Sequence, residues 1–183
     1  SKQWVCGSYN DHIQIKAINK NEILIHGNLF KWLNGQNVTG TTDLIQLVLD
    51  TVNRLSQIFN AITPTDTEIE NIKLGLFRIY RIDVNKALLF DDKQKAQQYL
   101  TSIKEHGTYP RRDREVEKNG IYFGKGSKRT TLLYYFKGQE IRSHNKQQTT
   151  LTSELREYAD RMVRCEVRLF SQQLRDSELQ YGY

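Results

Sequence analysis

Cysteine, proline and long apolar runs are scarce in this 183-residue sequence. Two cysteines are too few for a disulfide scaffold or for a cysteine-based zinc site. No run of 18 apolar residues occurs, so no membrane-spanning helix is expected. The opening stretch SKQWVCGSYND also lacks the apolar segment of a signal peptide. We therefore expect a reduced, cytoplasmic protein without a membrane partner.

The length and the charge distribution indicate the number of domains and the kind of binding partner. The length suits one domain with a proper core, so we expect a single domain over residues 1–183. The net charge is +6, and it is concentrated: residues 104–148 hold eleven Lys and Arg against five Asp and Glu, and the other residues hold sixteen of each sign. Such a basic segment favours a polyanion, most often nucleic acid, although a solvated basic loop has the same composition.

Hydrophobic periodicity predicts a mixture of strands and helices. Residues 76–88, 121–125, 129–137 and 162–170 have the pattern of strands, and residues 93–106 and about 153–161 that of helices. The charged, turn-rich stretch 107–120 is expected to be a mobile loop. Upstream, the patterns predict two strands and one helix, at 12–18, 22–26 and about 44–60.

From residue 76 to about 171 the predicted order is strand, helix, strand, strand, helix, strand. That order is typical of the split βαβ, ferredoxin-like fold. The predicted class is therefore α+β, with an antiparallel sheet that carries helices on one face, extended by the two N-terminal strands and their helix.

Alternation along three of these strands separates an apolar face from a polar one. The polar set is Arg81, Asp83, Tyr135, Lys137, Arg164, Glu166 and Arg168. Any antiparallel sheet has a solvated polar face, and alternation does not fix the strand register. The set is nevertheless chemically suggestive. Carboxylates can hold Mg²⁺ or Mn²⁺ against a phosphate, a tyrosine hydroxyl can attack phosphorus, and arginines can bind flanking phosphates.

At these same residues the chain resembles the gene-two protein family, the replication initiators of filamentous phages. Four stretches carry the resemblance, in matching order and spacing: GQNVTGTTDL at 35–44, RID at 81–83, TTLLYYFKGQE at 130–140 and LREYADRMVRCEVRL at 155–169. Each is weak alone, and all four in order are a strong signal.

The resemblance implies a rolling-circle endonuclease that nicks one strand of phage DNA with Mg²⁺ or Mn²⁺ and later rejoins it. The family's nucleophile is the tyrosine of a Y-x-K-x-x-E motif, which falls on Tyr135, with Lys137 two positions on. The tyrosine would become joined to the 5′ phosphate. The family's RID and R-x-E motifs place acidic residues at Asp83 and Glu166, which we expect to bind the metal, with Glu140 as a third candidate.

The resemblance also implies a setting and partners. These are the bacterial host cytoplasm, DNA that is single-stranded or locally melted at an origin, and host helicase and polymerase. Two features depart from related nickases. Many hold their metal with a His-hydrophobe-His (HUH) pair, which the four histidines here do not form, so a carboxylate site is expected. The chain also ends where family members continue, as expected for an isolated nuclease domain or a short relative.

Other residues have competing interpretations. Tyr134 is the alternative nucleophile, but alternation points it into the core beside Phe136. We expect phosphate contacts from Arg81, Arg164 and Arg168 on the polar face, and from Lys125, Lys128 and Arg129 around the hairpin turn. The alternative function is a non-catalytic module that binds single-stranded nucleic acid, with Tyr135 as a stacking platform. Two acids on that face would repel phosphates without a metal, which favours the enzyme.

Overall fold

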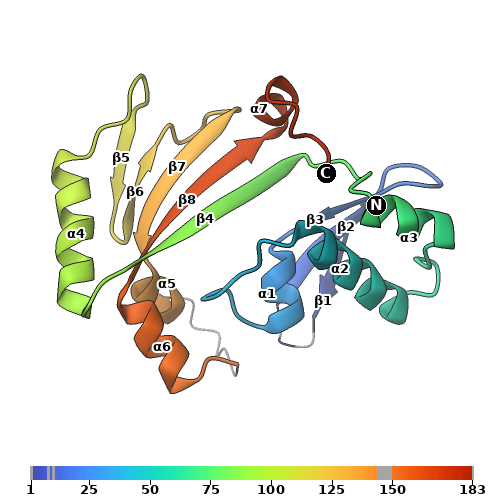
Figure 1. The fold of residues 1–183 in the computed structure, drawn as a ribbon, viewed down its shortest axis with the longest axis horizontal. Coiled ribbons are helices and arrows are strands. Elements are labelled where there is room, and N and C mark those ends of the chain that lie inside the picture. The colour runs from blue at the N-terminus through green and yellow to red at the C-terminus, as the bar shows by residue number, and fades with distance from the viewer. Residues whose placement is uncertain (1, 8, 10, 144–149, 183) are drawn as a thin grey trace. The chain divides into compact units, whose positions relative to one another are not determined.

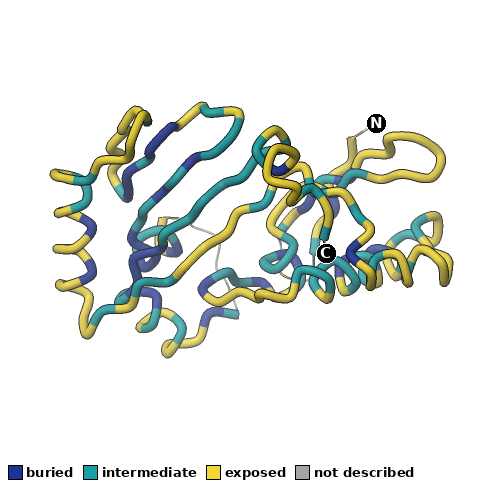
Figure 2. Tube along the Cα trace, turned by 45° about the horizontal axis from the view of Figure 1, so that its top comes forward, coloured by how far each residue is buried: buried dark blue, intermediate teal, exposed yellow. Residues whose placement is uncertain are grey.

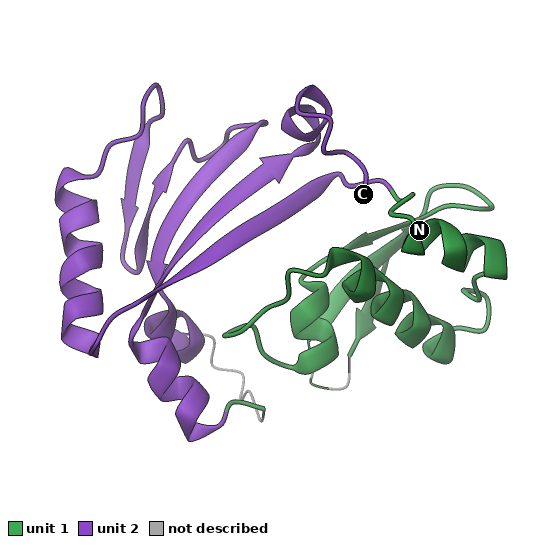
Figure 3. Cartoon of the chain, viewed as in Figure 1, with its two compact units in different colours: residues 1–77, 147–151, 182–183 green, residues 78–146, 152–181 purple. Residues whose placement is uncertain are grey.

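The computed structural model describes residues 2–7, 9, 11–143 and 150–182. The chain divides into two compact units, each described below by itself (Figure 3). The first unit comprises residues 1–77 with short stretches at 147–151 and 182–183, and the second comprises residues 78–146 and 152–181.

The first unit packs helices on one face of a small antiparallel sheet. Its described elements are β1 (Lys2–Cys6), β2 (His12–Ala17), β3 (Ile23–His26), α1 (Leu29–Asn34), α2 (Leu44–Ile58) and α3 (Asp66–Lys73). The strand order is β1-β2-β3. Val5, Ile13 and Ile15 on the inner face pack with Trp32 of α1 and Leu55 of α2. The core of this unit therefore lies between the sheet and its helices.

Side-chain caps explain where the helices of the first unit begin. Asp43 accepts a hydrogen bond from the Gln46 backbone N–H and so caps α2. Thr65 and Glu68 form a reciprocal capping box at the start of α3, a helix that the sequence patterns did not predict. Each of these two helices thus begins directly after a residue whose side chain caps it.

The second unit is built on one antiparallel sheet of five strands (Figure 1). Its elements are β4 (Arg81–Leu89), α4 (Lys93–His106), β5 (Arg114–Glu117), β6 (Gly120–Phe123), β7 (Thr130–Phe136), α5 (Lys137–Ser143), α6 (Ser153–Asp160), β8 (Met162–Phe170) and α7 (Ser171–Asp176). The strand order is β4-β8-β7-β6-β5. Ala96 and Leu100 of α4 pack on Phe136 of β7 and Val163 of β8, so α4 covers one face.

The predicted α+β class is confirmed, and the second unit has the expected antiparallel sheet. The two predicted N-terminal strands do not extend that sheet, because they pair with β1 in a separate one. The connection through α4, however, differs from the predicted one. Helix α4 leads into an extra strand, β5, and not directly into β6. Four antiparallel pairings link β4 to β5, so these two strands run parallel, as a βαβ crossover requires. The three strands that carry the polar set are still neighbours, with β8 between β4 and β7.

Two segments of the second unit differ from the sequence-based expectation. Residues 114–117, expected in a mobile loop, form the edge strand β5. Strand β7 ends at Phe136, and Lys137 begins helix α5 instead of continuing the strand. Burial rises across the sheet from the mostly exposed β4 to β7, which Figure 2 shows along the chain.

Candidate functional site

Tyr135 lies near the end of β7, on the sheet face opposite helix α4. Its neighbours Tyr134 and Phe136 belong to the cluster that packs under α4, and alternate strand residues point to opposite faces. In the sheet, Tyr135 pairs with Arg164 on β8 and with Gly120 on β6. The predicted assignment of Tyr135 to the polar face is therefore confirmed, and so is that of Tyr134 to the core.

Lys137 and Glu140 lie in the first turn of α5, directly after the strand that carries Tyr135. The Lys137 Nζ atom is 2.6 Å from a Glu140 carboxylate oxygen and 5.9 Å from the centre of the Tyr135 ring. Lys137 has no exposed surface, which is rare for a lysine unless it is paired. The Y-x-K-x-x-E spacing thus corresponds to a strand end followed by one helical turn, in which residues i and i+3 are neighbours.

The surroundings of the Tyr135 hydroxyl favour its protonated form. Burial raises the pKa of Tyr135, and the negative charges of Glu166 and Glu140 raise it further. Arg164, by its charge and a hydrogen bond, opposes this rise in the pKa. In the core, burial and a hydrogen bond with Cys165 raise the pKa of Tyr134 to about 12. At neutral pH, deprotonation of Tyr135 therefore needs added positive charge or a base.

The strand register resolves how high on the sheet each polar residue lies. Arg164 is level with Tyr135, Glu166 is two residues further along β8, and Asp83 on β4 is level with Arg168, two residues further still. Diagonal neighbours in a sheet are about 7 Å apart. Tyr135, Glu166 and Asp83 therefore follow a diagonal line, with Glu166 in the middle.

Each predicted metal-binding carboxylate has a cationic partner. Asp83 accepts two hydrogen bonds from Arg81, at 2.8 Å and 2.6 Å. Glu166 accepts one from Arg168 Nε at 2.8 Å, and Glu140 pairs with Lys137. Within the described part of the chain, no group of three or more His, Cys, Asp and Glu side chains is placed to hold a metal ion. The assignment of metal ligands stays a prediction, and of the three residues Glu166 and Glu140 are those that influence Tyr135.

Most of the cations predicted to contact DNA are engaged within the protein. Arg164 is buried, and Arg168 lies near both Glu166 and Asp83. Lys125 contacts the carboxylates of Glu115 and Glu117.

Two more of these predicted contacts lie at the turn between β6 and β7. Arg129 is 2.6 Å from a carboxylate oxygen of Asp176. Lys128 is exposed and makes no ion pair with the described residues. A phosphate could therefore bind Lys128 directly. At the cations that already form ion pairs, it would have to compete with their carboxylate partners.

Two neighbours of Tyr135 on β6 were not identified from sequence. Gly120 lies directly opposite Tyr135, and a Cβ atom there would collide with the Tyr134 carbonyl oxygen and lie 3.0 Å from the Tyr135 Cβ. Tyr122, two residues further along β6, has the charged groups of Lys125 and Arg168 at 5.0 Å and 5.8 Å from its ring. That Gly120 and Tyr122 are neighbours of Tyr135 follows only from the strand register, which alternation alone does not provide.

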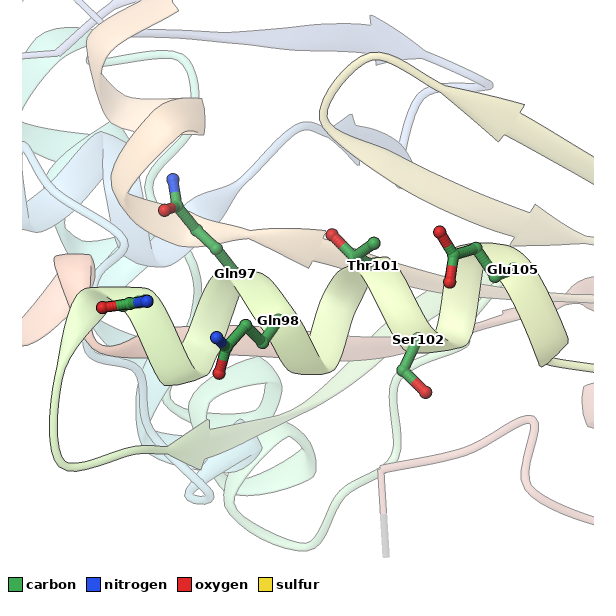
Figure 4. A pocket seen from close by; sticks show the side chains of 6 residues that line it. Gln97, Gln98, Thr101, Ser102 and Glu105 are labelled. Carbon is green, nitrogen blue, oxygen red and sulfur yellow. The ribbon is translucent and has the colours of Figure 1, made fainter.

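Helix α4, on the opposite face of this sheet, borders a hollow. A shallow hollow follows helix α4 and is lined by Gln94, Gln97, Gln98, Thr101, Ser102 and Glu105 (Figure 4). Because α4 covers the opposite face of the sheet, the hollow is not part of the Tyr135 site. His12, His26 and His106 are all exposed, and His144 lies outside the described residues. None of the described helices has the length and apolar character needed to cross a membrane.

Comparison with known proteins gives a consistent result. The family model for the N-terminal part of the phage replication-associated protein, the gene-two protein, matches residues 1–183. The replication-associated protein of this type from Enterobacteria phage I2-2 is 25% identical over 190 residues, which cover 97% of this chain and 54% of that protein. The chain thus spans about half the length of this curated relative. No solved structure matches the chain. Since the family model covers every residue, the chain belongs to the gene-two family of replication-associated proteins, in its N-terminal part.

Proposed function

We propose that the chain is the nicking and joining endonuclease of a rolling-circle replication initiator, with Tyr135 as its nucleophile. The observation that carries this proposal is the convergence of four charged side chains on one tyrosine. Lys137 and Glu140 reach it from the first turn of α5, and Arg164 and Glu166 from β8. The membership in a replication-associated family supports DNA as the substrate.

The proposed reaction is a transesterification. The Tyr135 hydroxyl oxygen attacks a DNA phosphorus, and the bond from phosphorus to the 3′ oxygen breaks as the new bond forms. The phenolic proton passes to Glu166 or Glu140, which returns it to the departing 3′ oxygen. The products are a phosphotyrosine linked to the 5′ end and a free 3′-OH. Attack of a 3′-OH on this linkage reverses the step and rejoins the strand.

Lys137 and Arg164 would stabilise the negative charge that develops at phosphorus. Both are buried, and fixed cations act more strongly in a site from which water is excluded. A divalent cation is part of the proposal, with Glu166 and Glu140 as the protein ligands nearest Tyr135. Mg²⁺ in such sites commonly takes one or two carboxylates and completes its shell with phosphate and water. When bound, it would polarise the phosphate.

The non-catalytic alternative, base stacking on Tyr135, has less support. A stacking platform must offer an open ring face, but burial is the main cause of the raised pKa of Tyr135. The buried Lys137 amine also lies over that ring. This arrangement suits a reactive hydroxyl better than an exposed platform.

The test is covalent capture from a random pool. The purified chain is incubated with single-stranded oligonucleotides of randomised central sequence and Mn²⁺, and then denatured. Protein-linked DNA is recovered through an affinity tag and sequenced. We expect a denaturant-resistant adduct on a restricted set of sequences, lost in Tyr135→Phe and retained in Tyr134→Phe.

Tyr134→Phe is the matched control because it removes an adjacent hydroxyl that faces the core. An adduct that persists in Tyr135→Phe would overturn the assignment of the nucleophile. Reversible DNA binding without an adduct, in Mn²⁺ and in Mg²⁺, would support the non-catalytic alternative instead.

A further inference from the structure

The sheet of the first unit has an outer face, away from its helices, with an unusual composition. Strand pairing and alternation assign to it Lys2, Trp4, Cys6, His12, Gln14, Lys16, Leu24 and His26, here called the Trp4 face. The alternate residues, including Val5, Ile13 and Ile15, face the core against Trp32 and Leu55. The Trp4 face is therefore the side of this sheet that the core does not use.

Trp4 lies at the centre of the edge strand β1 and differs sharply in exposure from the second tryptophan of the chain. Its exposed fraction is 65%, compared with 1% for Trp32. Across the strands it pairs with Gln14, which pairs in turn with His26. His12 and Lys16 lie at the diagonal positions, within reach of a large ring. A flat aromatic ring is thus presented among polar and basic neighbours.

The charges of the Trp4 face are of one sign. Lys2 lies directly opposite Lys16 in the β1–β2 pair, and like charges in that arrangement destabilise a sheet. The face contains no Asp or Glu among its eight residues. An anion bound between the two lysines would relieve their repulsion.

The acidic residues at the ends of β2 are engaged elsewhere. The Asp11 carboxylate is 2.9 Å from the Lys31 amine of α1, and Glu22 accepts a hydrogen bond from Asn19 in the turn before β3. Asp11 has the parity of the core-facing Ile13 and Ile15, whereas Glu22, just before β3, has the parity of Leu24 and His26 and borders the Trp4 face. The protein therefore supplies no described carboxylate partner to the Lys2–Lys16 pair.

We propose that the Trp4 face of the first unit is a binding surface for single-stranded DNA. An unpaired base would stack on Trp4, and the flanking phosphates would lie against Lys2 and Lys16. Stacking on an aromatic ring together with basic side chains is the common way to bind single strands without sequence preference. A duplex fits less well, because its bases already stack on one another. The surface does not depend on any chemistry at Tyr135.

The two tryptophans make the test direct, because only Trp4 is exposed. Tryptophan fluorescence is titrated with an oligothymidylate of about 20 nucleotides, long enough to cover a single-strand site. The full chain is used with EDTA present, so that no metal-dependent reaction takes place. We expect saturable quenching of the exposed component, and none in Trp4→Phe. By anisotropy, Trp4→Ala should weaken binding about tenfold, the worth of one stacked base.

Charge variants identify the phosphate contacts. Lys2→Gln with Lys16→Gln should lower the slope of log affinity against log salt by about 1.4, since each phosphate contact on a single strand contributes about 0.7. Lys73→Gln is the matched control, because Lys73 lies on α3 and is paired with Glu70. It should leave the slope unchanged.

Three outcomes would overturn the proposal. The first is DNA binding by anisotropy with unchanged Trp4 emission. The second is a Trp4 emission shift that depends on protein concentration, which would assign the face to self-association. The third is a shift with anionic lipid vesicles and none with DNA. Because cleavage is not measured, a failure of the proposed nicking reaction would leave the result of this titration intact.

Discussion

The Lys137 amine lies 2.6 Å from the Glu140 carboxylate, and the lysine has no exposed surface. The pair occupies the first turn of α5, and its amine is also near the Tyr135 ring. An ion pair with a fully buried member is costly to break, because removing one partner weakens the compensation of the other charge. Lys137 and Glu140 therefore contribute both to the stability of the second unit and to the proposed reaction.

Lys137→Met should destabilise the second unit by about 3 kcal/mol, as expected for removal of one member of a buried pair. Adding Glu140→Gln to this variant should restore part of the lost stability, because the stranded carboxylate is removed. Neither variant should regain adduct formation. The measurements are urea unfolding and single-turnover adduct yield. Recovery of both stability and adduct in the double variant would show that Lys137 is only structural.

Gly120→Ala should impair the site from the neighbouring strand. The new Cβ atom would collide with the Tyr134 carbonyl oxygen and press on the Tyr135 Cβ. We expect a loss of about 1–3 kcal/mol, the usual effect of overpacking, and a lower adduct yield under conditions where the variant is fully folded. Gly40→Ala is the matched control, since a Cβ there meets nothing within 4 Å. Equal stability and yield in both variants would contradict the tight approach of β6 to Tyr135.

The rate of adduct formation should rise with pH. Burial raises the pKa of Tyr135 above its ordinary value, so only a small fraction is tyrosinate near neutral pH. That fraction increases about tenfold per pH unit below the pKa. Single-turnover rates should therefore climb through the range from about pH 7 to 9 without a plateau. A profile already level at neutral pH would contradict a protonated Tyr135.

The same shift has a consequence for stability, with a definite sign. The folded state holds the Tyr135 proton in a range where the unfolded chain, with a tyrosine pKa of about 10, has released it. The contribution of Tyr135 to the free energy of unfolding is therefore complete below about pH 10. It is lost as the pH rises above that value. Tyr135→Phe should show a weaker decline than the unsubstituted chain in alkaline urea titrations.

Glu166→Gln and Asp83→Asn should differ in their effect on the adduct. Glu166 is the diagonal neighbour of Tyr135, and its charge influences the Tyr135 pKa, while Asp83 lies further along the same diagonal and binds Arg81. We expect Glu166→Gln to lower the single-turnover rate about 100-fold, within the range of a general base, and Asp83→Asn to lower it much less. Circular dichroism verifies that both variants are folded. Equal losses would place Asp83 in the site as well.

Much of the second unit could be predicted from the sequence. Helix α4 begins and ends at the predicted residues because Asp92 caps it and Gly107 follows it. Strand β8 also has its predicted bounds, with alternating apolar residues between two helices. The face on which Tyr135 lies followed from the same alternation.

Three features of the structure could not be predicted from the local pattern of apolar and polar residues. The start of α5 was hidden because TTLLYYFK continues the alternation of β7 into the first helical turn. The relative heights of Tyr135, Glu166 and Asp83 depend on strand pairing, which residues distant in the sequence decide. The Trp4 face was not predicted because the net positive charge lies in residues 104–148 and the sequence pattern did not predict β1.

The most direct test of the account is to locate the DNA within the protein. The captured adduct is digested with nuclease and protease, and the modified peptide is fragmented in a mass spectrometer. We expect a nucleotide phosphate on Tyr135, in the peptide that also contains Tyr134. A nucleotide on Tyr134, on Tyr122 or on a residue outside β7 would contradict it.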